Sequence, residues 1–330
     1  MTLHRTLNRR QLLGAGLAGV AGLSLPLLHP SLAWAQNAPG LGTPTLPAPG
    51  FRKLQLGAVD IIALNDGVAR RPLGEEFVKN AALDQVKALL ASQNLPTDHI
   101  DIPFTAFLVV SGGQRVLLDT GFADNGGPTT GRLVANLAAA GFQPTDIDHV
   151  VISHYHGDHI NGLRQKDGRL TFPNARVHVP APEHAFWTDD ARMAAAPQGM
   201  QGAFAAVRRV FNGLPADRLL PFQPGAELLP GIQTQAAFGH TPGMSTVTVR
   251  SQGQAFMFVA DLTNIPALFA RNPDWAVQFD MDAEAARQTR RRVFDQIVKD
   301  QMLVGGYHFP FPAMGRMRPE GNGYRFEPLA

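Results

Sequence analysis

Three histidines and one aspartate lie within six residues near the middle of this sequence, directly after an apolar run. The run at residues 148–153 is typical of a buried strand, and it leads into His154-Tyr155-His156-Gly157-Asp158-His159. A protein core cannot bury three imidazoles and a carboxylate at that density without a partner for them. Imidazole nitrogen and carboxylate oxygen are the ligands that zinc and related divalent cations accept. We therefore expect a metal site in the loop that follows this strand.

Three more ligand candidates follow strand-like runs farther along the chain. His240 lies within Gly239-His240-Thr241-Pro242-Gly243, Asp261 follows the apolar run at 256–260, and His308 comes soon after the run at 302–306. The competing interpretation of the first cluster is a solvated histidine-rich turn, which would not require further ligands at other strand ends. The complete set is large enough for a site that holds two metal ions.

The rest of the chain alternates strand-like and helix-like segments. Strands are expected at 58–64, 104–110, 115–119, 148–153, 175–179, 231–238, 245–250, 254–261 and 302–306, and helices at 84–93, 130–140, 182–188, 202–211 and 282–301. Hairpins, strands and helices in this mixed order favour two packed sheets flanked by helices.

The spacing of the first cluster resembles the His-x-His-x-Asp-His signature of the metallo-β-lactamase superfamily. Residues 239–243, Asp261 and His308 are similar to later elements of that family, and Asp119-Thr120-Gly121 is similar to its early Asp-x-Gly motif. The resemblance implies the metallo-β-lactamase fold. This is an α+β architecture in which two mixed β-sheets, flanked by helices, form a four-layer αββα sandwich.

The resemblance also assigns the ligands to two ions that share a hydroxide nucleophile. One ion would lie on His154, His156 and His240, the second on Asp158, His159 and His308, and Asp261 would bridge them. Asp158 and Asp261 would thus act in catalysis. Asp119 would not bind a metal ion itself but would orient a ligand imidazole by accepting a hydrogen bond from it. Zinc is the default expectation for both ions, with manganese, cobalt or iron as alternatives, because histidine and aspartate bind all four.

Within the superfamily the chain is similar to the methyl parathion hydrolases, of the organophosphorus hydrolase type, from about Gly57 to its end. The similar stretches include residues 65–67, 131–133, 138–144, 172–175 and 320–326. This implies hydrolysis of organophosphate triesters, with aryl esterase or lactonase activity beside it. The apolar wall of the substrate pocket would come from Trp187 and Phe204, although aromatic residues at helical spacing equally often pack in a core.

Two other functions remain open. A dedicated lactonase, including one for acyl-homoserine lactones, would use the same metal ligands, but those lactonases carry a tyrosine three residues after the bridging aspartate, where this chain has Asn264. A non-catalytic periplasmic metal-binding protein is the second alternative, since a fold does not guarantee an activity.

The N-terminus has the composition of an export signal. Arg9 and Arg10 precede an apolar stretch at 14–28, and Ala33-Trp34-Ala35 forms a small-residue cleavage site. The arginine pair resembles a twin-arginine signal, and an ordinary Sec signal is the alternative. We expect a signal peptide at 1–35, a linker rich in proline and glycine at 36–50, a hydrolase domain at 51–330 and a periplasmic location.

Charge and composition restrict the partners. The chain has 29 basic and 27 acidic residues, and loss of the three arginines in 1–35 leaves 26 against 27. Such a nearly neutral chain offers no basic patch to nucleic acid. No window beyond the signal approaches the roughly 18 apolar residues of a membrane span. There is no cysteine, so thiolates cannot bind the metal. A small-molecule ester, lactone or phosphotriester is the expected partner, and the resemblance adds a homodimer.

Overall fold

The computed structural model describes residues 40–329 of the chain. The predicted signal peptide at 1–35 and the start of the predicted linker lie outside the described residues. Residues 40–50 contain neither helix nor strand, and the first strand begins at Phe51.

The first β-sheet contains seven strands in the order of the sequence, from β1 to β7. Their bounds are β1 Phe51–Leu56, β2 Val59–Pro72, β3 His99–Ser111, β4 Gln114–Leu118, β5 His149–Val151, β6 Arg176–Pro180 and β7 Leu219–Phe222. The strands from β1 to β4 pair antiparallel, whereas those from β4 to β7 pair parallel. All three residues of β5 are buried among parallel neighbours, which explains the continuous apolar run before His154.

The second sheet also has seven strands, in the order β14-β13-β12-β11-β10-β9-β8. Their bounds are β8 Glu227–Leu229, β9 Ile232–Ala236, β10 Ser245–Ser251, β11 Gln254–Phe258, β12 Leu303–Gly305, β13 Met314–Glu320 and β14 Gly323–Pro328. Only β11 and β12 pair parallel. Both sheets are therefore mixed. They pack on each other through aromatic side chains, since the Phe107 ring of β3 lies 5.4 Å from the rings of both Phe256 and Phe258 of β11.

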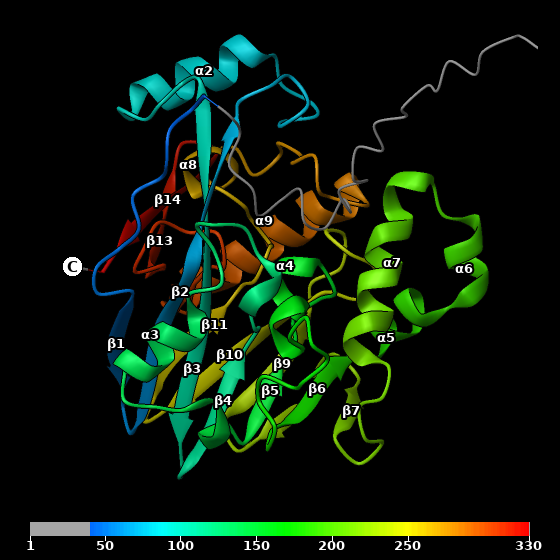
Figure 1. The fold of residues 1–330 in the computed structure, drawn as a ribbon. Helices are drawn as coiled ribbons and strands as arrows, with labels where there is room; N and C mark the ends of the chain where they lie inside the picture. Colours follow the sequence, from blue (N-terminus) through cyan, green and yellow to red (C-terminus); the bar gives the residue numbers. More distant parts are fainter. Residues whose placement is uncertain (1–39, 330) are drawn as a thin grey trace, which may run out of the picture.

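Helices cover the outer faces of the two sheets (Figure 1). The helices of the described residues are α2 Leu83–Ser92, α3 Leu133–Ala139, α4 Gly157–Ile160, α5 Ala181–Thr188, α6 Asp190–Ala195, α7 Gln198–Phe211, α8 Pro266–Phe269 and α9 Ala283–Lys299, with 3-10 turns η1 Ala123–Asn125, η2 Pro144–Asp146 and η3 Asn161–Leu163. On the first sheet, α3 contacts β1 and β2, and α5 contacts β6 and β7; on the second sheet, α9 contacts β13. The expected αββα sandwich is confirmed.

The strands that the sequence patterns missed lie mostly at the sheet edges. β1 and β7 are the edges of the first sheet, β14 and β8 those of the second, and β13 adjoins β14. Edge strands face solvent on one side and carry charges and proline, so their apolar alternation is weak. Conversely, the strand expected at 254–261 ends at Phe258, and Ala260 adopts a left-handed conformation with φ of 47° that turns the chain away from the sheet.

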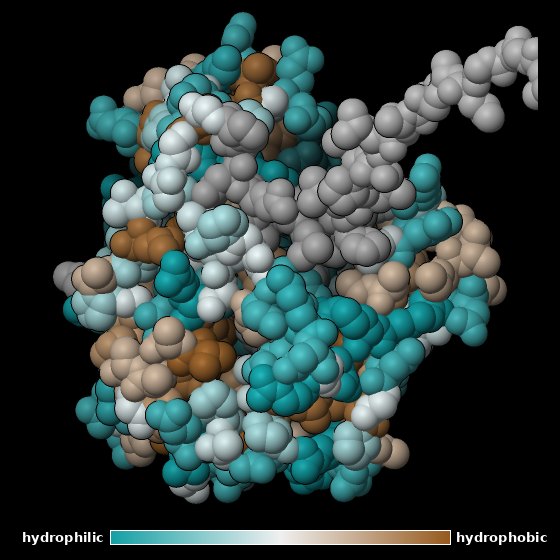
Figure 2. Space-filling view, viewed as in Figure 1, coloured by the Kyte–Doolittle hydropathy of each residue, from teal (hydrophilic) through white to brown (hydrophobic). Residues whose placement is uncertain are grey.

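The loops that carry the ligand candidates meet at one end of the sandwich. They follow β5, β11 and β12, and a fourth loop joins β9 to β10. A backbone hydrogen bond of 3.0 Å from Ser245 N to Ser153 O ties the loop of one sheet to the other. On the face seen in Figure 2, hydrophobic residues form small separate patches among hydrophilic ones. Within residues 40–329, no helix combines the length and apolarity that crossing a bilayer requires.

Candidate metal centre

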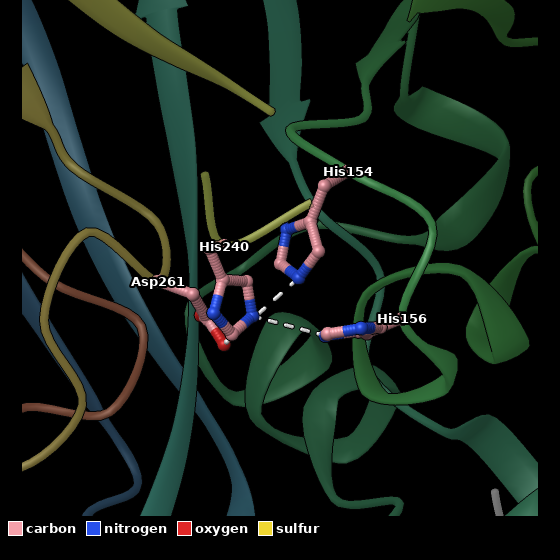
Figure 3. Close-up of side chains that lie close together, drawn as sticks. All are labelled: His154, His156, His240 and Asp261. Carbon is pink, nitrogen blue, oxygen red and sulfur yellow. Dashed lines mark hydrogen bonds and ion pairs between the residues drawn. The ribbon is translucent and has the colours of Figure 1, made fainter. Parts of the chain in front are cut away.

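A first group of ligand candidates consists of His154, His156, His240 and Asp261, drawn from both sheets (Figure 3). The Nε2 atom of His240 lies 3.0 Å from His156 Nδ1 and 3.2 Å from Asp261 Oδ2. The Nε2 atom of His154 lies 3.9 Å from the same carboxylate oxygen. One nitrogen of each imidazole and one carboxylate oxygen thus face a common point, all within 4.8 Å of one another.

A second group consists of Asp158, His159, His308 and again Asp261. The Nε2 atom of His159 lies 3.3 Å from Asp158 Oδ2 and 3.2 Å from Asp261 Oδ1. The Nε2 atom of His308 lies 3.0 Å from Asp261 Oδ2 and 3.5 Å from Asp158 Oδ2. Asp261 belongs to both groups, so its carboxylate lies where two ions would be bridged.

Several buried atoms that face these groups have no other partner. They are His154 Nε2, His159 Nε2 and Asp261 Oδ1. A buried polar atom without a partner is costly, so such atoms are rare in native proteins. A divalent cation would satisfy imidazole nitrogens and carboxylate oxygens together. The residues therefore fit two metal ions, one in each group.

Asp119 lies behind His159 and is fully buried. Its Oδ2 accepts hydrogen bonds from His159 Nδ1 and from Ser153 Oγ, both 2.7 Å long, and its Oδ1 accepts one of 2.7 Å from Ser153 N. A carboxylate at Nδ1 keeps the proton of His159 on that nitrogen, which leaves Nε2 free to bind a cation. The ring of Tyr307 lies 3.9 Å from the His159 ring, and its hydroxyl donates to the Asp158 carbonyl at 2.5 Å.

Asp280 orients His240 as Asp119 orients His159. Its Oδ1 lies 3.0 Å from His240 Nδ1, and its Oδ2 accepts a 3.4 Å hydrogen bond from Arg290. Arg290 is completely buried and donates three further hydrogen bonds of 2.7 to 2.9 Å, to the carbonyls of Leu262, Pro273 and Trp275. The guanidinium thus fixes the loops that carry Asp261 and Asp280.

Sequence reasoning missed both Asp280 and Arg290. Neither lies in a recognisable motif, and only folding brings α9 beside the loop of His240. One signal was available: Arg290 lies four residues after Ala286 and four before Phe294, on the apolar face of α9. An arginine at such a position is buried only when it is paired.

Glu183 joins the two loops that supply the histidines of the first group. It is completely buried; Oε1 accepts from Tyr155 N at 3.0 Å and from Trp187 Nε1 at 2.8 Å, and Oε2 accepts from Gly243 N at 2.7 Å. Burial raises the pKa of Glu183, and these hydrogen bonds oppose the rise. A Cβ atom at Gly243 would lie 2.2 Å from the Glu183 nitrogen, so only glycine permits this contact.

The histidines of the centre differ in charge when no metal ion is bound. Burial lowers the pKa of His156 to about 3 and that of His154 well below its usual value. Burial acts in the same direction on His240, but Asp261 and Asp280 outweigh it and raise the pKa of His240 to about 9. Aspartates likewise overcome burial and raise the pKa of His159. Metal binding must therefore displace protons from these two imidazoles.

Trp187 and Phe204, the expected wall of the substrate pocket, each expose only 1% of their surface. Their ring centroids are 4.8 Å apart, and the Trp187 ring lies 6.4 Å from that of His156. Both pack in the core, where Trp187 supports His156, and their contact with a substrate stays a prediction. Asn264, three residues after Asp261, is 2% exposed, and neither its Nδ2 nor its Oδ1 has a hydrogen-bond partner.

Known proteins share this architecture. The dizinc quorum-quenching lactonase AidC, solved with a product described as N-hexanoyl-L-homoserine, is 27% identical, with a TM-score of 0.80 over 85% of this chain and 98% of AidC. The hydrolase AbOPH of the beta lactamase superfamily is 28% identical, with a TM-score of 0.79 over 85% of this chain and 98% of its own.

A sequence relative and a family model agree with these structures. Ribonuclease TTHA0252 of Thermus thermophilus is 29% identical over 166 residues, which are 50% of this chain and 36% of the ribonuclease, so the chain spans about a third of that relative's length. Residues 103–304 match the model of the metallo-beta-lactamase superfamily, and they include every ligand candidate except His308. The chain belongs to the metallo-beta-lactamase superfamily and is one of its metal-dependent hydrolases.

Proposed function

We propose that this chain is an exported hydrolase of uncharged lactones and carboxylic esters that uses two metal ions. The observation that carries the proposal is the position of Asp261, whose carboxylate belongs to both ligand groups and whose Oδ1 has no other partner. Two ions on one bridging carboxylate are typical of hydrolytic centres. Zinc is the proposed metal, in keeping with the dizinc centre of AidC.

The metal ions, when bound, would activate water and polarise the carbonyl group of the substrate. The chain's own residues hold and orient those ions. His154, His156 and His240 would hold one, and Asp158, His159 and His308 the other. Asp119 and Asp280 keep the protons of His159 and His240 on Nδ1, and so present Nε2 toward the centre.

Lactones and esters are the proposed substrates because AidC, similar over most of this chain, was solved with a product of lactone opening. Asn264 takes the place of the tyrosine that acyl-homoserine lactonases carry, which favours a broader ester and lactone specificity over a dedicated one. Phosphotriesters are a second candidate, favoured by the stretches at 65–67, 131–133 and 320–326 that resemble the methyl parathion hydrolases. The predicted signal at 1–35 supports a periplasmic location for this activity.

The test is a substrate panel on protein stripped of metal by a chelator and then restored with zinc, manganese or cobalt. The panel is dihydrocoumarin, N-hexanoyl-homoserine lactone, p-nitrophenyl acetate and dimethyl p-nitrophenyl phosphate. We expect two equivalents of bound metal and turnover that returns with it. Asp261→Asn should abolish turnover, and Asp148→Asn, a carboxylate bonded to Arg115 at the other end of β5, should not. Two bound equivalents without turnover of any substrate would instead identify a metal-binding protein.

A further inference from the structure

A cavity of about 240 Å³ has His308 in its wall and, among the described residues, no other member of the two metal groups. Apart from the segment of His308 and Pro310, its walls come from three separated parts of the chain: Leu90 of α2 with Leu95 after it, Ile100 and Pro103 of β3, and Ile265 and Pro266 at the start of α8. None of these residues was singled out by the sequence motifs. The cavity exists only because α2 and α8 pack beside the start of β3.

The cavity adjoins the metal centre through one side chain. The His308 ring lines it and also presents Nε2 to Asp261 Oδ2, 3.0 Å away. Pro103, another lining residue, holds that ring by accepting a 2.8 Å hydrogen bond from His308 Nδ1 through its carbonyl. The cavity therefore lies directly beside the atoms that would hold the reacting group of a substrate, with the His308 ring between them.

The chemistry of the walls selects an aliphatic group. Among the described residues that line the cavity, leucine, isoleucine, proline and alanine predominate. There is no Phe, Tyr or Trp and no Lys or Arg to attract an anion, and the polar lining residues are His99, Asp101 and His308. The one carboxylate in the lining, Asp101, is held by Arg70 through two hydrogen bonds of 2.7 and 2.8 Å. Its charge is therefore already matched.

Leu95 gives a second indication of a ligand. It is one of three large hydrophobic side chains that are well exposed within residues 40–329, with 39% of its surface accessible, and it lines this cavity. An aliphatic chain bound there would cover it and remove apolar surface from water.

We propose that this cavity binds the linear acyl chain of the substrate, so that the enzyme prefers esters and lactones with medium-length aliphatic chains. The assignment rests on the proposed ester and lactone hydrolysis, and it adds the chain specificity that the metal ligands cannot provide. Ala267, a half-buried lining residue on α8, is the position at which a larger side chain would fill the cavity.

The test compares zinc-loaded wild type, Ala267→Phe and Leu95→Ala on p-nitrophenyl acetate and p-nitrophenyl octanoate. We expect Ala267→Phe to lower the ratio of kcat/KM for octanoate to that for acetate by about tenfold or more, since a few buried methylenes are at stake. Leu95→Ala should lower the same ratio by several-fold. The matched control is Ala88→Phe on the exposed face of α2, which should leave the ratio within twofold. An unchanged ratio in both cavity variants would overturn the assignment.

A binding measurement separates this assignment from the proposed function. Calorimetric titration of metal-free protein with octanamide, an uncharged linear probe, should show binding that Ala267→Phe weakens by about tenfold or more. If the loaded enzyme hydrolyses no ester but octanamide binds in this way, the proposed function fails, whereas the binding of an aliphatic chain in the cavity stands. If octanamide does not bind to folded wild type, or if benzamide binds more tightly than octanamide, the acyl-chain assignment is wrong. Should Ala267→Phe not fold, Leu95→Ala carries the same comparison.

Discussion

Replacing Asp119 or Asp280 by asparagine should weaken metal binding at two different ligand groups. Asp119 accepts a hydrogen bond from His159 Nδ1 in the second group, and Asp280 does so from His240 Nδ1 in the first. Asparagine can turn an amide N–H toward that nitrogen in place of an acceptor. The imidazole proton is then driven to Nε2, the atom that would bind the metal.

The size of the effect follows from the contacts. Loss of a carboxylate behind a ligand histidine weakens metal binding by about 10- to 100-fold, which is about 1.4 to 2.8 kcal/mol. Asp119 accepts three hydrogen bonds of 2.7 Å, two of them on the oxygen that faces His159. Asp280 accepts one of 3.0 Å and one of 3.4 Å. We therefore expect Asp119→Asn near the upper end of the range and Asp280→Asn near the lower end.

The assay is a zinc titration of metal-free protein against a chromophoric chelator that resolves two binding steps. Each variant should weaken metal binding strongly in one step. It should weaken the other step to a smaller extent, because both groups share Asp261. The matched control is Asp148→Asn. This carboxylate lies away from the centre and accepts a 2.8 Å hydrogen bond from Arg115 N, so its loss should leave both steps unchanged. If both steps keep the wild-type affinity in Asp119→Asn, the claim that this carboxylate fixes the tautomer of His159 is refuted.

Three further predictions concern stability and the polar groups around the centre. Arg290→Met should destabilise the metal-free protein by about 3 to 5 kcal/mol in urea unfolding, because it removes the buried guanidinium partner of Asp280 and leaves three carbonyls without their donor. The partly exposed Arg291→Met should cost less than about 1 kcal/mol. His149 and His178 share a buried 3.0 Å hydrogen bond, and burial lowers the pKa of His178 to about 4, below its unfolded value. The stabilisation is therefore complete above about pH 6.5 and is lost as the pH falls toward 4. His178→Gln should flatten this part of the plot of unfolding free energy against pH. Asn264→Leu should raise the free energy of unfolding by about 1 kcal/mol, since it removes an unpaired buried amide, and it should lower kcat/KM for lactones. A gain in stability with unchanged turnover would exclude a role of the amide in substrate binding.

The ligand set was readable from the sequence because its spacing is local. Residues 154–159 lie in one loop, and His240, Asp261 and His308 each follow a strand-like run. Buried strands among parallel neighbours are continuously apolar, so β5 and the run before Asp261 were visible. The edge strands β1, β7, β8 and β14 were not, since one side of each faces solvent and no apolar pattern marks it.

The sequence could not reveal the groups that hold the ligands in place. Asp280 bonds to His240, Arg290 of α9 bonds to Asp280, and Glu183 bonds to Tyr155 and Gly243 in two different loops. The aromatic pair Trp187 and Phe204 shows the opposite case: helical spacing was compatible with either a core or a pocket, and the fold buries both rings. Such contacts depend on which elements pack together, and no local pattern encodes that.

Residue types and strand ends are local properties, so the metal-binding side chains and the architecture that carries them could be predicted from the sequence alone. Three features depend on how the folded chain packs: Asp261 lies between two ligand groups, Asp119 and Asp280 fix the proton positions of two imidazoles, and a cavity lies beside His308. These are properties of distances between segments far apart in the chain. They arise when two sheets pack and bring four loops to one end of the sandwich.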